Sequence, residues 1–381
     1  MSEIKNLIDK FCPNGVKYKR VGDISEVGTG SSNGNEASDE GAYPFFIRSQ
    51  TVKAKDDYEY DEEAIIIPGE GGVGDIYHYI NGKYALHQRV YRIHFTTKEI
   101  TTRFAYYCFN EFFKAFIMKK AVSATVTSIR KPMIQDFTIP IPPLPVQEEI
   151  VHILDNFTDL TAELQAELQA RAKQYDYYRD NMLTFDESVP RMKLSSIAQI
   201  YDGTHQTPEY KDSGIPFISV ENIGDIYNSK KYITKEAFDA YKIKPKKGDL
   251  FMTRIGSIGV CAVFDHDEDI AYYVSLALIR PNPEIVKAEY LKFVIESLIG
   301  RKELRKRTLV NAVPIKVNKD DIGKITLPIP SLEVQDMIID KLKRFDDLCV
   351  NISNGLPAEI EARQKQYEYY RDQLLSFKKA N

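Results

Sequence analysis

The sequence predicts an α+β fold in which two mixed α+β domains are separated by two long helices, with internal pseudo-two-fold symmetry. Two stretches of the chain repeat each other, both have helical periodicity, and the segments before them contain short β-type runs bounded by turns. At 381 residues the chain is also longer than one hydrophobic core usually organises. The expected order along the chain is therefore domain, helix, domain, helix.

The internal repeat sets the expected boundaries. ELQARAKQYDYYRDNMLTF, residues 167–185, is identical to EIEARQKQYEYYRDQLLSF, residues 359–377, at 12 of 19 positions. TIPIPPLPVQEEI, residues 138–150, matches TLPIPSLEVQDMI, residues 326–338, in the same way. We expect a first domain at 1–137, a first helical region at 138–187, a second domain at 188–325 and a second helical region at 326–381.

Each repeated stretch is expected to form a long amphipathic helix. In the first copy, apolar residues recur at intervals of three and four, at Ile150, Ile153, Phe157, Leu160 and Leu164. The proline cluster PIPPLPVQ marks the start, because proline suits the first helical turn, and the end is expected near Phe185. In the second copy, Gly355 and Pro357 should interrupt or kink the helix. Neither helix can bury its apolar stripe alone, so the two copies are expected to pack against each other.

The tyrosine-rich phrase KQYDYYRD, which recurs as KQYEYYRD, allows two interpretations. It is either a duplicated core seam with solvated charges on its flank, or a surface that a partner recognises in both copies. Residues that match although they lie off the apolar stripe slightly favour partner binding. These are Gln174, Tyr177 and Arg179 in the first copy and Gln366, Tyr369 and Arg371 in the second.

The two globular segments are expected to be related α+β domains. β-type runs occur at residues 43–49, 64–68 and 89–95 in the first, and at 215–220, 249–255 and 272–280 in the second. Each domain then has a helical stretch, RFAYYCFNEFFKAFIM or AEYLKFVIESLIGRKELRK. GAYPFFIRS parallels GIPFISV, and GEGGVGDIYHY corresponds in position to RIGSIGVCAVF. Domains that diverge while their helices stay alike are expected to perform different versions of one job.

Metal and nucleotide chemistry are not indicated. The four cysteines form no C-x-x-C pair and the six histidines show no zinc-binding spacing. Gly69, Gly71 and Gly74 form a G-x-G-x-x-G, but the following segment alternates like a strand and is expected to turn at Asn81 and Gly82, which favours a tight turn over a nucleotide site. The sequence has no phosphate-binding loop and no amino-methyltransferase motif, and we predict no catalytic residue and no metal ligand.

Composition fits a soluble protein with a local basic surface. Hydrophobic residues make up 43% and charged residues 28%, and the formal charge is −4. No stretch has the form of a signal peptide or approaches the roughly 18 apolar residues of a membrane helix, so a cytoplasmic location is expected. Basic residues cluster in KIKPKKGD, RKELRKR and FKAFIMKK and at Arg130 and Lys131, beside polar loops. Such clusters are typical either of a solvated face or of a surface that binds duplex DNA.

Essentially the whole chain resembles the specificity (S) subunit of type I restriction-modification systems. The resemblance rests on helices that open with PIPPLPVQEEI or PIPSLEVQDMI and close with YYRDNMLTF or YYRDQLLSF, and on DGTHQTPEY and GDLFMTRIGSIG in the second domain. It implies two target recognition domains, each contacting one half of an asymmetric site in double-stranded DNA. It also implies an antiparallel coiled coil that docks two methyltransferase (M) subunits, which restriction (R) subunits would join. The M subunits would bind S-adenosylmethionine, so no cofactor is expected on this chain.

The resemblance further implies where DNA is contacted. The candidates for base contacts lie in turns and at strand edges: Arg48, Ser49, Gln50, Glu70, His87, Gln88, Arg89, His205, Gln206, Glu221, Asn222, Arg254, Ser257 and Tyr273. The loops before the helices add Arg130, Lys316 and Lys319 as candidates for contacts with the DNA backbone. Another class of function stays open, namely a coiled-coil scaffold that joins two protein-binding domains without DNA.

Overall fold

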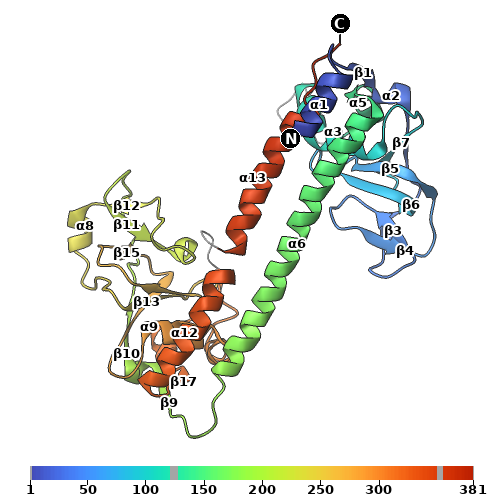
Figure 1. Cartoon of the computed structure of the whole chain (residues 1–381). Coiled ribbons are helices and arrows are strands. Elements are labelled where there is room, and N and C mark those ends of the chain that lie inside the picture. The colour runs from blue at the N-terminus through green and yellow to red at the C-terminus, as the bar shows by residue number, and fades with distance from the viewer. Residues whose placement is uncertain (1, 121–127, 350–354, 381) are drawn as a thin grey trace. The chain divides into compact units, whose positions relative to one another are not determined.

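The computed structural model describes residues 2–120, 128–349 and 355–380, and the chain divides into two compact units (Figure 1). The first comprises Met1–Leu164 with Ile360–Asn381, and the second comprises Gln165–Glu359. The long helix α6 (Leu144–Met182) gives its first part to one unit and its last part to the other. Each unit therefore contains one globular domain and helix segments from both repeats.

A six-stranded sheet organises the first domain, in the order β2-β7-β5-β6-β3-β4. All its pairs are antiparallel except β3 with β6, which are parallel. A separate pair, β1 with β8, joins the start of the domain to the segment before α6. The strands are β1 (Lys17–Arg20), β2 (Ser25–Thr29), β3 (Tyr43–Phe46), β4 (Lys53–Lys55), β5 (Tyr60–Pro68), β6 (His78–Leu86), β7 (Val90–Phe95) and β8 (Thr138–Ile141). The helices are α1 (Ser2–Phe11), α2 (Val21–Ile24), the short η1 (Gly34–Glu36), α3 (Thr102–Cys108), the π-helix η2 (Phe109–Phe113), α4 (Lys114–Lys120) and α5 (Lys131–Gln135).

The second domain repeats this plan in smaller sheets, ordered β10-β16-β13-β14, β12-β11-β15 and β17-β9. β11 pairs with β15 in parallel, as β3 does with β6. The strands are β9 (Arg191–Lys193), β10 (Ala198–Asp202), β11 (Ile215–Ile218), β12 (Tyr232–Ile233), β13 (Asp249–Thr253), β14 (Cys261–Phe264), β15 (Ala271–Tyr272), β16 (Leu276–Pro281) and β17 (Thr326–Pro328). The helices are α7 (Leu194–Ile197), η3 (Val220–Asn222), α8 (Lys235–Asp239), α9 (Ala288–Glu296), α10 (Leu298–Arg305), α11 (Lys319–Ile322) and α12 (Leu332–Cys349). The last helix of the chain, α13 (Leu356–Leu375), belongs to the first unit except at its start.

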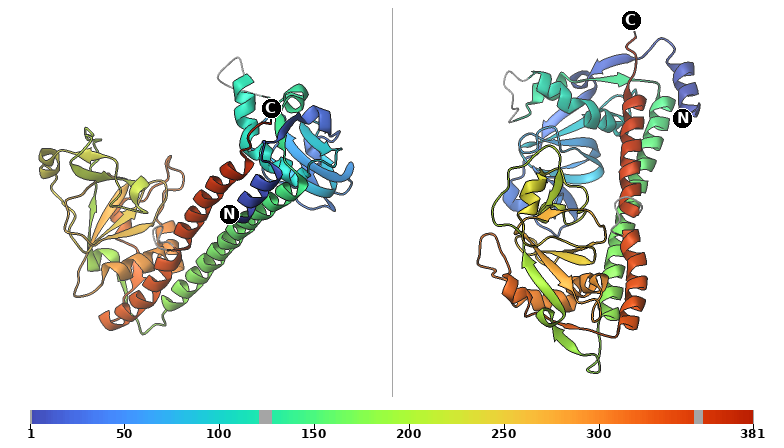
Figure 2. Two further views of the ribbon diagram at one scale, coloured as in Figure 1. Left: turned by 45° about the horizontal axis from the view of Figure 1, so that its top comes forward. Right: turned by 90° about the vertical axis from the view of Figure 1, so that its left-hand side faces the viewer.

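Aromatic side chains join the helix segments in the same way in both units. In the first, the ring centroids of Phe157 on α6 and Tyr370 on α13 are 5.5 Å apart. In the second, those of Tyr178 on α6 and Phe345 on α12 are also 5.5 Å apart. Phe157 and Phe345 are equivalent positions of the repeat, as are Tyr178 and Tyr370. Within each unit the start of one repeat therefore packs on the end of the other, and Figure 2 shows these segments side by side.

A fully buried glutamine fastens the start of each repeat to its domain. Oε1 of Gln147 accepts the backbone N–H of Thr101 at 2.9 Å, and its Nε2 donates to the carbonyls of Glu99 and Pro142 at 2.8 and 2.7 Å. Gln335 makes the same three bonds at 3.0, 2.9 and 2.9 Å, with Lys287, Ile285 and Pro330. The glutamine in PLPVQ and SLEVQ thus binds three backbone groups, of which the carbonyl of Pro142 or Pro330 is buried and the other two are partly buried.

The α+β class and the long helices expected from the sequence are confirmed. α6 begins inside the proline cluster at Leu144 and ends at Met182, close to the expected Phe185. The second helical region consists of α12 and α13, with Gly355 just before α13 and Pro357 in its first turn, as the predicted interruption requires. The single strand expected at 272–280 is instead two, β15 and β16.

The turn expected at Asn81 and Gly82 is wrong. Both residues lie inside β6, where they pair with Glu63 and Glu62 on β5. An Asn-Gly pair makes a hairpin only when the flanking segments pair with each other, whereas here β6 pairs along its length with β5. Gly82 has a φ of +125°, which glycine adopts within the strand without strain.

Candidate nucleic-acid interface

A charged cluster lies where three strands of the first domain end. Arg48 follows β3, Glu70 follows β5, and Arg89 lies between β6 and β7. Oε2 of Glu70 accepts a hydrogen bond from Nη1 of Arg89 at 2.9 Å and a longer one from Nη1 of Arg48 at 3.4 Å. The hydrogen bond and charge of Arg89, with smaller effects of Arg48 and Arg130, lower the pKa of Glu70. The carboxylate is therefore ionised at neutral pH.

Strand pairing explains why these residues meet. β3 and β6 are parallel, so both leave the sheet at the same edge, and the pairing of β5 with β7 brings Glu70 beside Arg89. Gly71 has a φ of +74°, which permits the tight turn that carries Glu70. The backbone N–H of Ile129 donates to the carbonyl of Gly69 at 2.8 Å, which ties this turn to the segment that contains Arg130.

Two hollows open beside Glu70. One, of about 270 Å³, has Arg48, Glu70 and His87 in its lining, and the other, of about 340 Å³, has Glu70, Gln88, Arg89 and Arg130. His87 is buried, and burial followed by the charges of Arg48 and Arg89 lowers its pKa. Its Nδ1 accepts the backbone N–H of Arg89 at 3.0 Å, so the neutral ring carries its proton on Nε2.

Most first-domain candidates for DNA contacts thus come together around Glu70. The two exceptions are Ser49 and Gln50, for which no hydrogen bond to Glu70 is found among the described residues. Ser49 accepts the backbone N–H of Thr51 on its Oγ at 3.0 Å, and its carbonyl oxygen lies 3.1 Å from Nε2 of His78. Gln50 is exposed. The six residues that gather at the hollows are Arg48, Glu70, His87, Gln88, Arg89 and Arg130.

The corresponding edge of the second domain lacks these charges. Two features of the backbone occur in both domains and allow the domains to be aligned. The parallel strand pair of Phe46 and Leu86 in the first domain corresponds to that of Ile218 and Tyr272 in the second. The backbone hydrogen bond from Ile129 to Gly69 corresponds to that from Val317 to Arg254. On this alignment the counterparts of Arg48, Glu70 and Arg89 are Val220, Ile255 and Ser275. The two domains therefore present different chemistry on one backbone plan.

Arg254 does not lie open to solvent, as a base contact would require. Its side chain is buried, its guanidinium forms an ion pair with Asp202, and its Nε donates to the carbonyl of Val317 at 3.2 Å. Contact with a base would require it to leave both partners. We therefore expect Arg254 to position the neighbouring loop, which carries the exposed Ser257.

Arg254→Ala should lower the free energy of unfolding by about 2 kcal/mol, because it leaves the carboxylate of Asp202 and the carbonyl of Val317 without this donor. Urea denaturation followed by circular dichroism measures the change. Arg305→Ala, at an exposed position of α10, is the matched control and should change stability by less than about 0.5 kcal/mol. An Arg254 variant as stable as this control would contradict the structural role.

The other second-domain candidates are exposed or half-buried: His205, Gln206, Glu221, Asn222, Ser257, Tyr273, Lys316 and Lys319. Glu221 forms an ion pair with Lys231 at 3.0 Å. A β-bridge between Lys316 and Ile255 brings Lys316 to the loop of Ser257. Tyr273 packs on Phe217 with a centroid distance of 6.3 Å, so part of its ring belongs to the core.

The repeated residues off the apolar stripe divide into two groups. Tyr177 and Tyr369 are 65% and 58% exposed, and Gln174 and Gln366 are exposed and half-buried. Arg179, in contrast, is only 3% exposed and pairs with Asp176 at 2.7 Å, and Arg371 is half-buried and pairs with Glu111. Ion pairs inside the units therefore hold both arginines, and Arg179 has little accessible surface, whereas the two tyrosines are accessible.

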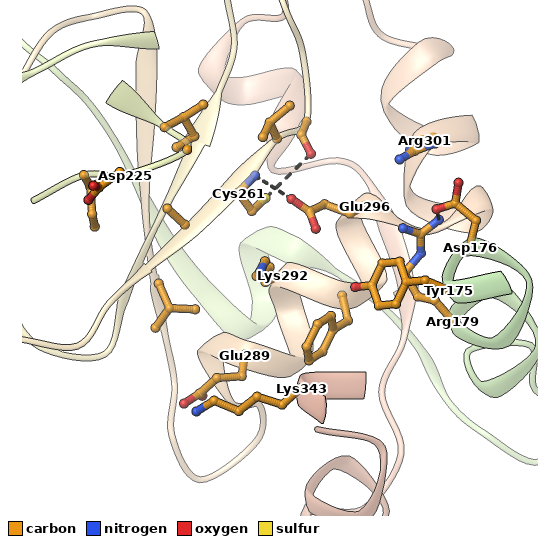
Figure 3. Close-up of a pocket in the computed structure, with 18 of the residues that line it drawn as sticks. Tyr175, Asp176, Arg179, Asp225, Cys261, Glu289, Lys292, Glu296, Arg301 and Lys343 are labelled. Atoms are coloured by element: carbon orange, nitrogen blue, oxygen red, sulfur yellow. Dashed lines mark hydrogen bonds and ion pairs between the residues drawn. The ribbon is translucent and has the colours of Figure 1, made fainter. Parts of the chain in front are cut away.

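A mixed-charge hollow of about 770 Å³ lies beside Arg179 in the second unit (Figure 3). Its lining includes Tyr175 and Asp176 from α6 and Glu296 from α9, which accepts the backbone N–H of Cys261 at 2.8 Å. Burial raises the pKa of the Cys261 thiol well above its usual value, which disfavours the reactive thiolate.

Among residues 2–120, 128–349 and 355–380, no group of three or more His, Cys, Asp and Glu side chains could hold a metal ion. No helix in these ranges is long and apolar enough to cross a membrane.

Comparison with known proteins decides the family. Residues 13–174 and 187–362 each match the family described as type I restriction modification DNA specificity domain. The chain belongs to this family. A type I restriction enzyme specificity subunit from Haemophilus influenzae is 30% identical over 88% of this chain and 89% of its own length. The EcoR124I/EcoR124II specificity subunit from Escherichia coli is 35% identical over 62% of this chain and 60% of its own length.

Solved structures agree with this assignment at the level of the fold. The crystal structure of a type I S subunit from M. genitalium matches with a TM-score of 0.64 at 15% identity, covering 95% of this chain and 96% of that one. A structure from a study of type I system assembly and conformational transition matches with a TM-score of 0.58 at 14% identity, covering 96% and 98%. The mixed α+β fold with two specificity domains is therefore that of type I S subunits.

The sequence of this specificity-family chain does not by itself assign a role to two features. Gln147 and Gln335 lie in the repeated opening of the helices, and only their recurrence in PLPVQ and SLEVQ hinted at a role. The contact of Arg48 and Arg89 with Glu70 is the second feature. The sequence makes all three residues candidates for DNA contacts but does not show that they lie together. The recurring glutamine was a usable signal, whereas the arrangement around Glu70 depends on strand pairing.

Proposed function

We propose that the chain is a noncatalytic subunit that reads a bipartite, asymmetric site in double-stranded DNA and directs methyltransferase and restriction subunits to it. The contrast between equivalent edges of the two domains carries this proposal: one has Arg48, Glu70 and Arg89 where the other has Val220, Ile255 and Ser275. Domains with one backbone plan and different side chains would read two different half-sites, whereas two identical readers would read a palindrome.

In this proposal, residues 1–137 and 188–325 are the target recognition domains, and residues 138–187 and 326–381 form an antiparallel coiled coil with pseudo-two-fold symmetry. The equivalent aromatic pairs support it, because each joins the start of one repeat to the end of the other. With 39 residues, α6 is about 58 Å long. That length exceeds the helical turn of about 34 Å that separates two readers on one face of DNA.

The proposed partners follow the repeated surface. Tyr177 and Tyr369 are exposed at equivalent positions, so two copies of one partner could bind, and we assign these sites to two M subunits that restriction subunits join. S-adenosylmethionine would be bound by the M subunits and not by this chain. A DNA-reading complex of this kind would work in the cytoplasm.

Selection of duplexes from a randomised library by the chain assembled with its methyltransferase partner tests the proposal. The enriched site should consist of two different half-sites with an unread gap. Binding of the selected duplex, measured by fluorescence anisotropy, should weaken steeply with salt, with a slope of log affinity against log salt of about −3 if Arg130, Lys316 and Lys319 each neutralise one phosphate. No enrichment at any salt concentration would instead favour a protein scaffold that acts without DNA.

A further inference from the structure

We propose that Glu70 and Arg89 together read one G·C base pair in the major groove of the first half-site. This inference rests on the proposed function and specifies what one part of the interface recognises. This inference depends on three features of the cluster: the ion pair that orients Arg89, the available atoms of both side chains, and the different residues at the equivalent positions of the second domain.

Arg89 is held by one nitrogen while the others remain available. Its Nη1 donates to Glu70 at 2.9 Å, and its side chain is 58% exposed. Within the described part of the chain, its Nε and Nη2 have no hydrogen-bond partner. These two nitrogens form the planar fork that binds O6 and N7 of guanine. The ion pair thus positions the guanidinium before DNA arrives and reduces the ordering cost of the contact.

Glu70 also keeps an atom available for DNA. Both arginines bind its Oε2, and Oε1 accepts no hydrogen bond from any residue that the structure describes. An ionised carboxylate only accepts hydrogen bonds, and it repels phosphate. Among the groups that a base pair presents in the major groove, it can therefore accept from the N4 amino group of cytosine or the N6 amino group of adenine.

The two side chains are complementary to a single G·C pair. Guanine offers the two acceptors that Arg89 requires, and its paired cytosine offers the amino donor that Glu70 requires, on neighbouring edges of the same pair. An A·T pair gives the arginine fork only one adenine acceptor, beside an amino group that donates. Arg48, the second donor to Glu70, balances the carboxylate charge so that the cluster remains net positive beside DNA.

The second domain cannot make this contact at the equivalent place. Ile255 replaces Glu70 and Ser275 replaces Arg89, and Ser275 is buried, with its Oγ accepting the backbone N–H of Val220 at 3.1 Å. The G·C specificity should therefore appear at one position of one half-site and have no counterpart in the other. This gives the inference a positional signature in the selected DNA.

The test compares the sequences that the assembled complex selects from a randomised duplex library when it contains the wild-type chain, Glu70→Gln or Arg89→Ala. Arg89→Ala should lose preference for G·C at one position of one half-site by about 5- to 150-fold, which corresponds to the value of one bidentate contact, and Glu70→Gln should lose preference at the same position by a smaller factor. Preferences at the other positions and in the second half-site should stay unchanged. Asp39→Asn is the matched control, since Asp39 forms a surface ion pair with Lys53 in the same domain, and it should select the wild-type site.

The outcomes separate this inference from the proposed function. A uniform loss of affinity with unchanged base preferences would show phosphate contacts and overturn the G·C assignment. Unchanged selection by both variants would overturn it as well, while the proposed function would stand if the wild-type complex selects a bipartite site. A wild-type complex that enriches no sequence would overturn the proposed function and this inference together.

Discussion

Replacing both Tyr177 and Tyr369 by glutamate should abolish assembly with the methyltransferase partner. Both rings are mostly exposed, and each packs edge-to-face on the next tyrosine, at centroid distances of 5.6 and 5.4 Å. Exposed aromatic side chains supply much of the energy of protein interfaces, and a buried, unpaired carboxylate is strongly unfavourable. Co-purification followed by light scattering measures the number of partner copies bound.

The single variants sharpen this test. If the two sites are equivalent, Tyr177→Glu and Tyr369→Glu should each bind one partner copy where the unaltered chain binds two. Tyr58→Glu, at a 43% exposed tyrosine of the first domain, is the matched control and should assemble normally. Retention of two partner copies by the double variant would remove the docking role, and an unfolded double variant would show that the rings act in the fold.

Gln147→Ala and Gln335→Ala should each lower the free energy of unfolding by about 3 kcal/mol, because each leaves a partly buried N–H group, a partly buried carbonyl and a buried carbonyl without this partner. Gln147 belongs to the first unit and Gln335 to the second, so the losses should be similar in size and arise in different parts of the chain. Urea denaturation with hydrogen exchange of backbone amides measures both the size and the location of the loss.

The exposed Gln174 supplies the control for these two variants. Gln174→Ala removes the same side chain from the surface of α6 and should change stability by less than about 0.5 kcal/mol. If either buried variant loses less than about 1 kcal/mol, water or a shift of the helix start must replace the three hydrogen bonds.

Local patterns predicted the fold where local physics decides it. The proline cluster and the spacing of Ile150 and Phe157 predicted α6, and Gly355 with Pro357 predicted the separation of α12 from α13. The turn at Asn81 and Gly82 was mispredicted because the partner of that segment is β5, and a local sequence does not contain its strand partner. For the same reason, the sequence predicts one strand where the structure has two, β15 and β16, because each pairs with a different neighbour.

The candidate interface was predictable as a set of polar residues and not as a geometry. Arg89 and Glu70 are 19 residues apart, and they meet because β5 pairs with β7. Arg254 looked like a surface arginine at a strand end, but its partner Asp202 lies 52 residues away in sequence. Such distant partners decide which arginines stay accessible and which are buried, so the sequence alone does not distinguish the exposed Arg89 from the buried Arg254.

The exchange of helix segments between repeats has a mechanical consequence. A nick in the exposed connection at residues 186–188 would yield two pieces of comparable length. Each compact unit would still contain residues of both pieces, since Phe157 packs on Tyr370 in the first unit and Phe345 packs on Tyr178 in the second. Packing within both units would therefore hold the two pieces together after cleavage of the backbone. Separating the pieces would require both units to unfold.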